Sequence, residues 1–418
     1  MVRSAEQAGT PAVSSSTYRT VLRTPGAAVF FTTAAVGRVG IAMTSLGLVW
    51  LVHARTGSYT VAGIVTGSFA VAEAVAGPQV ARLIDRLGQT RVLPPLLLAH
   101  AAAVAALLGL VTAAGPVWSL AVGGVLAGAT IPQLGALSAA RWSRLLHDDT
   151  ASALPTAFSL ESLSVLPGVT EQRHGVPDRP VLVSAVAATG HPALGTVLAA
   201  ALTVAGGLAL AAQHRTAPTP HRPSPRPAPH RPIPARAHLI VLVGVNLGIG
   251  AYFGAIQVSV TAFAVQNGAP GTAAPLYAVS SGAGLLAGWL YGLRRWRRPP
   301  TTQLVLATTG LTIACLTLLT ARSPLNVAAG LAATGLAVPP ILVLCSVLTQ
   351  RSVHPTVLTQ GFTWLNSAGA AGTAATVAIS GRIIDTHGSH GGFTIATTAA
   401  TAIALLAASH LLTTRRQT

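Results

Sequence analysis

The sequence predicts an all-α membrane protein whose twelve transmembrane helices form two six-helix pseudo-repeats. Three observations lead to this fold class. The 418 residues are 51% hydrophobic and only 8% charged, whereas about a quarter of the residues in a soluble domain are charged. About twelve apolar runs reach the roughly 20 residues that cross a bilayer. A Pro- and Arg-rich segment divides these runs six and six, and short motifs of the first half return in the second.

The predicted spans are apolar runs bounded by charged residues, Pro or Gly. In chain order, the first six cover Ala27–His53, Tyr59–Ala81, Val92–Ala114, Val117–Ala140, Ala153–Val169 and Leu194–Ala212. The second six cover Leu239–Val265, Ala274–Leu293, Leu304–Thr320, Leu325–Leu348, Thr356–Ile383 and Phe393–Thr413. The chain thus divides into an N-terminal tail (1–25), an N-terminal bundle (26–212), a Pro/Arg-rich linker (213–238), a C-terminal bundle (239–413) and a short tail (414–418).

Span five is predicted to be irregular. Its counterpart, span eleven, stays apolar after Asn366, but the segment Thr170–Pro180 carries four charges before the chain turns apolar again. Two explanations compete. Either span five is short and an extended outer loop follows it, or the segment is a local error in the sequence, such as a reading-frame slip.

The basic residues indicate the orientation of the spans. All 26 are Arg, against nine acidic residues, and twenty of them fall on one side when the spans alternate. Cytoplasmic loops carry such an excess of Arg and Lys. We therefore expect a multi-pass protein of the cell membrane with the linker and both termini in the cytoplasm.

Several functional classes are excluded by composition. Without any Lys, the chain lacks the lysine of a phosphate-binding loop and the amine of a Schiff base. Cys315 and Cys345 lie inside apolar runs without metal-ligand spacing, so we expect them to serve packing. His387 and His390 beside Asp385 lack a fourth ligand and favour a turn over a metal site. We expect neither an enzyme nor a cofactor, a metal or a nucleic-acid partner.

Short motifs recur at an offset near 207 residues. Gly128-Ala-Thr-Ile-Pro132 returns as Gly335-Leu-Ala-Val-Pro339, and Arg38-Val-Gly-Ile-Ala aligns with Asn246-Leu-Gly-Ile-Gly. The segments Ala81–Gly88 and Gly381–Gly388 form a looser echo at opposite membrane faces. Such parallel repeats place a substrate path where the halves meet, near the bilayer midplane.

Three charged residues lie within the spans, namely Arg38, Glu73 and Glu161. A charge at the bilayer centre costs roughly 3 kcal/mol, so such residues usually pair or line a cavity. Their counterparts in the second half are polar. We therefore predict that six positions face a central cavity: Arg38, Glu73, Glu161, Asn246, Ser280 and Asn366.

Two roles are open for the carboxyl groups. Glu73 or Glu161 near Arg38 is a candidate proton-binding site, because burial favours and an adjacent Arg opposes protonation of a carboxyl group. The alternative is a static ion pair that only holds helices together. Among residues near span ends, Trp142, Trp289 and Trp296 are interpreted as a belt at the membrane interface.

The segment from Gly77 to Arg91 reads GPQVARLIDRLGQTR. It resembles the signature loop between helices two and three of the major facilitator superfamily, whose core is Gly-x-x-x-Asp-Arg-x-Gly-x-x-Arg. Asp85, Arg86, Gly88 and Arg91 match this pattern, and Ala81 stands where the family usually has Gly. With the twelve-span layout, the resemblance covers the whole chain. It implies the major facilitator fold and secondary transport by alternating access.

The resemblance also implies a gating loop. Asp85 would act in a cytoplasmic latch, its carboxylate meeting helix eleven and basic residues such as Arg141 when that side is closed. The alternative from the residues alone is a tight turn with interfacial anchors. The gating-loop residues implied in this way are Gly77, Asp85, Arg86, Gly88, Arg91 and Arg141.

Within the superfamily, the Ala- and Arg-rich texture resembles actinobacterial drug-exporter-like permeases. The function we expect is proton-coupled efflux of a hydrophobic or amphipathic small molecule by a monomer in the bilayer. Two alternatives stay open: an uptake permease for a sugar or other metabolite, and a membrane sensor or scaffold without flux.

Overall fold

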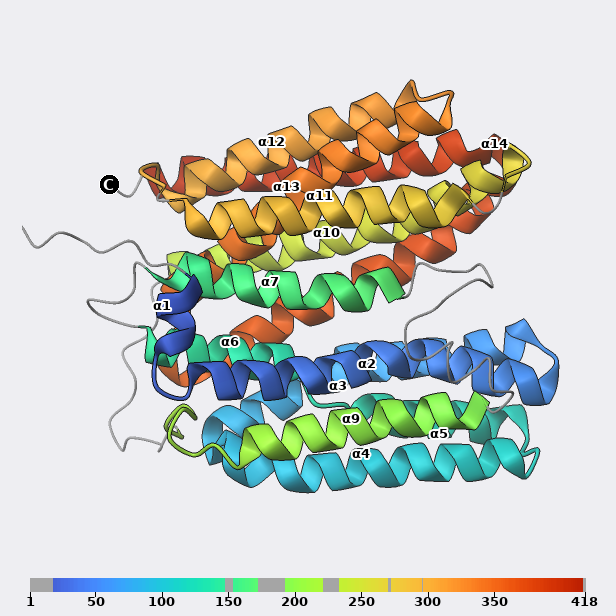
Figure 1. Cartoon of the computed structure of the whole chain (residues 1–418), viewed down its shortest axis with the longest axis vertical. Coiled ribbons are helices and arrows are strands. Elements are labelled where there is room, and N and C mark those ends of the chain that lie inside the picture. Colours follow the sequence, from blue (N-terminus) through green and yellow to red (C-terminus); the bar gives the residue numbers. More distant parts are fainter. Residues whose placement is uncertain are drawn as a thin grey trace, which may run out of the picture.

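The N-terminal half of the chain forms a bundle of long helices. A computed structural model describes residues 18–146, 153–171, 192–220, 233–269, 272–294 and 296–415 (Figure 1). The helices of this half are α1 (Tyr18–Arg23), α2 (Ala27–Thr56), α3 (Tyr59–Leu87), α4 (Gln89–Thr112), α5 (Val117–Ala129), α6 (Leu134–Leu145), α7 (Leu154–Glu171) and α9 (Pro192–Ala211).

The C-terminal half repeats this arrangement. Its elements are α10 (Ile233–Gln266), α11 (Ala273–Leu293), α12 (Pro300–Leu319), α13 (Pro324–Ser352), the 3₁₀ turn η3 (Pro355–Val357) and α14 (Leu358–Arg415). The last of these comprises two helices joined at Gly388, whose φ of 67° is not helical. The helix pair is thus spans eleven and twelve of the prediction.

Ten helices in the described ranges are long and apolar enough to cross a membrane. They occupy every predicted span except five and eleven. Helices fill those two places as well, as α7 and the first part of α14, and both are more polar. The all-α membrane fold with two six-helix repeats is therefore confirmed. The charged segment after Glu171 lies outside the described residues, which resume at Pro192.

Predicted span four differs in detail. The chain leaves the helix after Ala129 and resumes it at Leu134, so that α5 and α6 replace one continuous helix. Pro132 lies in this break and supplies no backbone N–H to a helix. The break brings the next side chain, Gln133, into the middle of the protein, where it becomes part of the site described below.

The repeat has a direct structural counterpart. A Cβ atom on Gly128 of α5 would collide with the backbone carbonyl of Phe69 on α3, and one on Gly335 of α13 with that of Ser280 on α11. Each half therefore brings its second and fourth spans into backbone contact at a glycine. Small residues allow such close approach between membrane helices.

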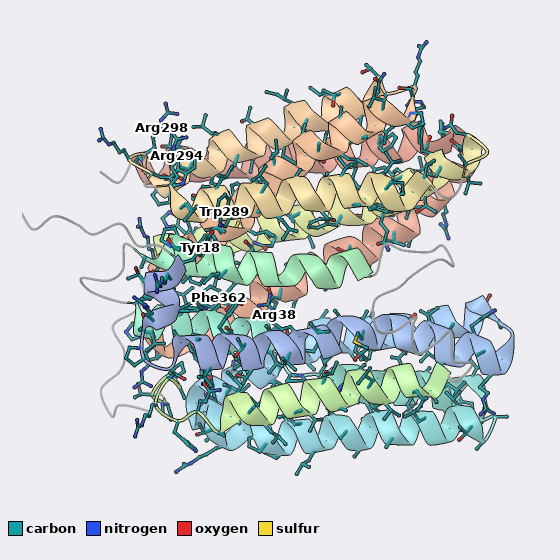
Figure 2. The ribbon with its side chains drawn as sticks, viewed as in Figure 1. Tyr18, Arg38, Trp289, Arg294, Arg298 and Phe362 are labelled. Carbon is teal, nitrogen blue, oxygen red and sulfur yellow. The ribbon has the colours of Figure 1, made fainter. Side chains whose placement is uncertain are left out.

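The loops rich in Arg lie at one end of both bundles. Figure 1 shows α1, the start of α2 and the C-terminal end of α14 at its left side, and Figure 2 labels Arg294 and Arg298 at that same end. We call this the Arg-rich end. Gly88, with a φ of 96°, makes the tight turn between α3 and α4 there. The opposite end carries the turn at Gly388, against Gln266 of α10.

Candidate functional site

A cavity of about 390 Å³ lies where the two halves meet. Helices α2, α3, α6 and α7 line it from one half, and α10, α13 and α14 from the other. Figure 2 shows Arg38 and Phe362, one from each half, in this central region. Of the six predicted positions, five line the cavity: Arg38, Glu73, Glu161, Asn246 and Asn366. Ser280 is buried on α11 and does not belong to the lining.

Arg38 and Glu161 form an ion pair across the cavity wall. The Arg38 Nη1 atom contacts Glu161 Oε2, and its Nη2 atom donates to the Glu161 backbone carbonyl at 3.3 Å. The other carboxylate oxygen accepts hydrogen bonds from Ser138 Oγ and from Trp142 Nε1, the latter at 2.8 Å. Both oxygens of Glu161 are thus occupied, which is what a charged group of low exposure requires.

Glu73 has a different environment. Gln133 Nε2 donates to its Oε1 atom at 3.2 Å, and the structure gives it no ion pair within the described residues. The Gln133 amide donates a hydrogen bond to Glu73 but brings no charge to balance a carboxylate. The two acidic side chains therefore differ in their surroundings: Glu161 is paired with Arg38, and Glu73 faces the cavity with no cation beside it among the described residues.

Polar groups of the two halves approach each other at Gly135. A Cβ atom there would lie 3.6 Å from Arg38 Nε and 3.9 Å from Asn366 Nδ2. Both side chains therefore lie within van der Waals reach of this one position on the cavity wall. Asn246 is also buried. Its Nδ2 atom donates to the Leu242 carbonyl at 3.0 Å, and its amide oxygen is a hydrogen-bond acceptor.

Asp85 connects the halves at the Arg-rich end. Its Oδ2 atom accepts a hydrogen bond of 2.9 Å from the backbone N–H of Gln360, in the first turn of α14. The N-terminus of a helix carries partial positive charge and unpaired N–H groups, so a carboxylate stabilises it. Gly77 lies on α3 two turns before Asp85 and packs against Thr363 of α14. The predicted contact with helix eleven is present.

The predicted contact between Asp85 and Arg141 is absent. The Arg141 guanidinium is fully buried and donates to Gln89 Oε1 at 2.8 Å and Thr216 Oγ1 at 2.7 Å. It also donates to the backbone carbonyls of Leu210 and Gln213 at the C-terminal end of α9. That end carries partial negative charge. Arg141 therefore braces α4, α6 and α9 within one half, while Arg86 and Arg91 are exposed.

A second contact stands at the symmetry-related position. Gly292 follows Asp85 by the repeat offset of 207 residues. Its carbonyl accepts a hydrogen bond of 2.7 Å from Thr156 Oγ1, in the first turn of α7. On one side a carboxylate meets the start of α14, and on the other a backbone carbonyl meets the start of α7. The two latches share their geometry but differ in charge.

Tyr18 of α1 reinforces the second latch. Its hydroxyl contacts the carbonyl oxygens of Gly288 and Trp289 at 3.2 and 2.9 Å, in the last turns of α11. Figure 2 shows Tyr18 and Trp289 close together at the Arg-rich end. A side chain on Gly292 would meet the Tyr18 ring, with its Cβ 2.8 Å from Cζ. Burial raises the pKa of Tyr18 to about 12, so the hydroxyl remains a donor at any physiological pH.

Solved structures similar to this chain include several membrane transporters. The human organic anion transporter MFSD10 aligns with a TM-score of 0.70 at 14% identity, over 93% of this chain and 99% of its own. FucP, a major facilitator superfamily transporter in its outward conformation, aligns at 0.66 and 14% identity, over 92% and 98%. The chain has the major facilitator fold. A bacterial homologue of the iron transporter ferroportin, in an outward-facing state, aligns at 0.67 and 12% identity, over 92% and 98%. No protein-family model and no curated protein matches the sequence.

Within the major facilitator fold, several contributing residues were not predicted. The sequence predicts Trp142 at the membrane interface, but it is fully buried and donates to Glu161. That interpretation was wrong, because a Trp near a span end and a Trp inside a bundle look alike in sequence. Gln133 directly follows the mid-span Pro132, and a proline at that place is the sequence feature that could have indicated a break in the helix beside Gln133. Tyr18 and Gly288 are 270 residues apart, and no local pattern joins them.

Replacing Asp85 with Asn should loosen the first latch. Asn keeps an acceptor for the Gln360 N–H but loses the charge, which weakens the hydrogen bond by about 1 to 2 kcal/mol. We expect the Arg-rich end to open roughly tenfold more often. The measurement is the rate at which a membrane-impermeant thiol reagent, added on that side, labels Ser162→Cys in a C315A/C345A background. D385N, near the opposite end, is the matched control and should leave the rate unchanged; an equal rise in both variants would refute the latch.

Replacing Tyr18 with Phe should release α1. The ring is kept but the carbonyls of Gly288 and Trp289 lose a donor, which costs about 1 kcal/mol, or roughly fivefold in the released population. Trypsin added at the Arg-rich end should cleave after Arg19 and Arg23 faster by that factor, because cleavage follows the open population. Mass spectrometry of the N-terminal fragments measures it. Tyr59→Phe is the control, and unchanged cleavage in Y18F would contradict the clasp.

Proposed function

We propose that this protein is a secondary active transporter that works by alternating access and couples export of a hydrophobic or amphipathic small molecule to proton entry. The observation that carries the proposal is the cavity between the halves, which contains a paired carboxylate and an unpaired one. Substrate paths in such repeats run between the two halves near the midplane. The proposal includes the placement of the Arg-rich end in the cytoplasm.

The arrangement of contacts suits one state of such a cycle. Among the described residues, the hydrogen bonds between the halves gather at the Arg-rich end, from Tyr18, Asp85 and Thr156. The rings of Phe158 and Phe362, one from each half, meet in the cavity lining with centroids 5.8 Å apart. With this end in the cytoplasm, the protein is in an outward-facing state. Opening inward requires these contacts to break.

Glu73 is the residue that we assign to proton coupling. A carboxyl group that faces a cavity without a cation can bind a proton or a cationic group of a substrate, and one excludes the other. Glu161 is held by Arg38, Ser138 and Trp142 and serves structure instead. The rest of the lining is largely apolar, with Phe158, Phe362 and Leu365, which favours a hydrophobic or amphipathic substrate of the kind that drug-exporter-like permeases carry.

An uptake permease for a sugar or other metabolite is the second candidate. The cavity lining includes three amide side chains, Gln133, Asn246 and Asn366, and amides donate to and accept from hydroxyl groups. One similar structure is that of the E. coli fucose:proton symporter FucP, with a TM-score of 0.67 at 14% identity over 93% of this chain and 99% of that one. The apolar share of the lining favours efflux.

The direction is tested by accumulation of ethidium, a fluorescent amphipathic cation, in cells with and without the gene. Lower accumulation that returns to the control level with a protonophore supports proton-coupled efflux. Raised accumulation, or raised uptake of a radiolabelled sugar, supports the permease. If neither a panel of dyes nor sugars responds, transport of these classes is refuted and the membrane sensor or scaffold becomes the better explanation.

A further inference from the structure

We propose that the loop between α11 and α12 is a binding site for the headgroup of an anionic phospholipid. The loop carries Arg294, Arg297 and Arg298 around Trp296, and its sequence, RRWRRPP, holds four Arg in five residues. Figure 2 shows Arg294 and Arg298 projecting outward at the Arg-rich end. This inference does not rest on the transported substrate or on its direction.

The loop has a built structure rather than a loose one. Trp296 stacks on Tyr291 with centroids 4.9 Å apart, and its Nε1 atom donates to the Tyr291 carbonyl at 3.2 Å. Gln303 of α12 ties both ends together: its Nε2 atom donates to the Arg298 carbonyl at 2.6 Å, and its Oε1 atom accepts from the Tyr291 hydroxyl at 2.7 Å. The side chains of Arg294, Arg297 and Arg298 therefore start from backbone that these contacts hold in place.

The guanidinium groups are available for an anion. Arg294, Arg297 and Arg298 are exposed, and no carboxylate in the described part of the chain pairs with them. Arg294 lies over the Trp296 ring, with its Cζ atom 4.8 Å from the centroid. This cation–π contact orients the guanidinium plane and leaves its N–H groups for an acceptor. Arg matches the oxygens of a phosphate with two parallel hydrogen bonds.

The neighbouring surface suits a lipid rather than a free anion. Directly before the arginines, α11 exposes Trp289, Leu290 and Leu293, with 48%, 49% and 39% of their surface accessible. These side chains belong to the last turns of a membrane span. A lipid with its phosphate at the arginines would lay its acyl chains along them. Trp and Arg at such a boundary form an interfacial anchor, and basic clusters beside a span attract anionic lipids.

The position connects the site with the second latch. Arg294 follows Gly292 by two residues, and the carbonyls of Gly288, Trp289 and Gly292 hold Tyr18 and Thr156. A lipid bound to Arg294 would hold the end of α11 in the geometry that these hydroxyl groups recognise. Lipid binding at this loop should therefore favour the state in which the Arg-rich end is closed.

The test measures binding of phosphatidylglycerol, against phosphatidylcholine, to the full-length detergent-solubilised protein by native mass spectrometry. Each Arg near an anionic headgroup is worth about 1 kcal/mol, or roughly fivefold in affinity. The variant R294Q/R297Q/R298Q should therefore lose its preference for phosphatidylglycerol by about 100-fold. The matched control R222Q/R226Q/R231Q removes the same charge from the linker and should keep it.

Each outcome decides the proposal. If both variants lose the preference for phosphatidylglycerol equally, the effect is a general attraction by net charge. If the loop variant keeps the preference, the loop is not the binding site. Either result overturns the inference. If millimolar inorganic phosphate displaces the lipid, the site takes a soluble phosphate and the lipid assignment is wrong. Should the triple variant fail to fold, the single variant R297Q, with an expected fivefold loss, replaces it.

Discussion

Replacing Arg38 with Gln is expected to lower the free energy of unfolding by about 3 to 5 kcal/mol. The side chains of Arg38 and Glu161 are only 14% and 11% exposed, so removal of the guanidinium leaves a carboxylate with little water to solvate it. Ser138 and Trp142 remain as donors to Glu161 Oε1 but bring no charge. In thermal unfolding of the solubilised protein, a fall in Tm on the order of 10 °C is expected.

The double variant R38Q/E161Q is the control for this prediction. It removes both charges and leaves two amide groups of similar size, and buried pairs replaced together often cost little. We expect it to recover most of the stability lost in R38Q. If both variants melt at the same reduced temperature, the loss comes from packing around Arg38 and the ion pair makes no energetic contribution of its own.

The course of the helices could be predicted because a bilayer imposes one solution on the backbone. Every N–H and C=O within the hydrocarbon must be paired inside the segment, so each long apolar run becomes a helix. Predicted span Ala274–Leu293 and observed α11, Ala273–Leu293, differ by one residue. Helix ends were less predictable. Helix α3 continues six residues past the predicted end to Leu87, because helical hydrogen bonds persist where the side chains turn polar.

The candidate site was predictable as a set of residues but not as a set of pairs. Charges in a membrane span identify Arg38, Glu73 and Glu161, since such groups are costly unless they line a cavity or pair. Which carboxyl meets Arg38 depends on helix rotation and on the break at Pro132, which turns Gln133 toward Glu73. The repeat likewise predicts Ser280 opposite Glu73, but Ser280 lies under Gly335 instead. The offset between repeated motifs does not show how each helix is rotated about its axis.

Replacing Glu73 with Gln is expected to abolish the response of transport to a pH gradient. With one proton exchanged per substrate, a gradient of one pH unit supplies about 1.4 kcal/mol and sustains about a tenfold substrate gradient. Gln keeps the size of Glu73 and can still bond with Gln133, but it cannot release a proton. In vesicles that contain E73Q, the substrate gradient should stay near unity, while downhill exchange of ethidium continues.

Glu161→Gln is the discriminating control, because it removes the other intramembrane carboxylate from the same cavity. If Glu73 alone carries the proton, E161Q should lower the stability of the protein, because Arg38 is left unpaired. Transport by the E161Q molecules that do fold should still respond to a pH gradient as transport by the unaltered protein does. A dye for internal pH measures proton movement in the same vesicles. If E161Q loses the response of transport to pH and E73Q keeps it, Glu161 is the proton-coupling residue and the assignment to Glu73 is wrong. Retention in both would separate transport from these carboxyl groups altogether, since no other acidic side chain lines the described cavity.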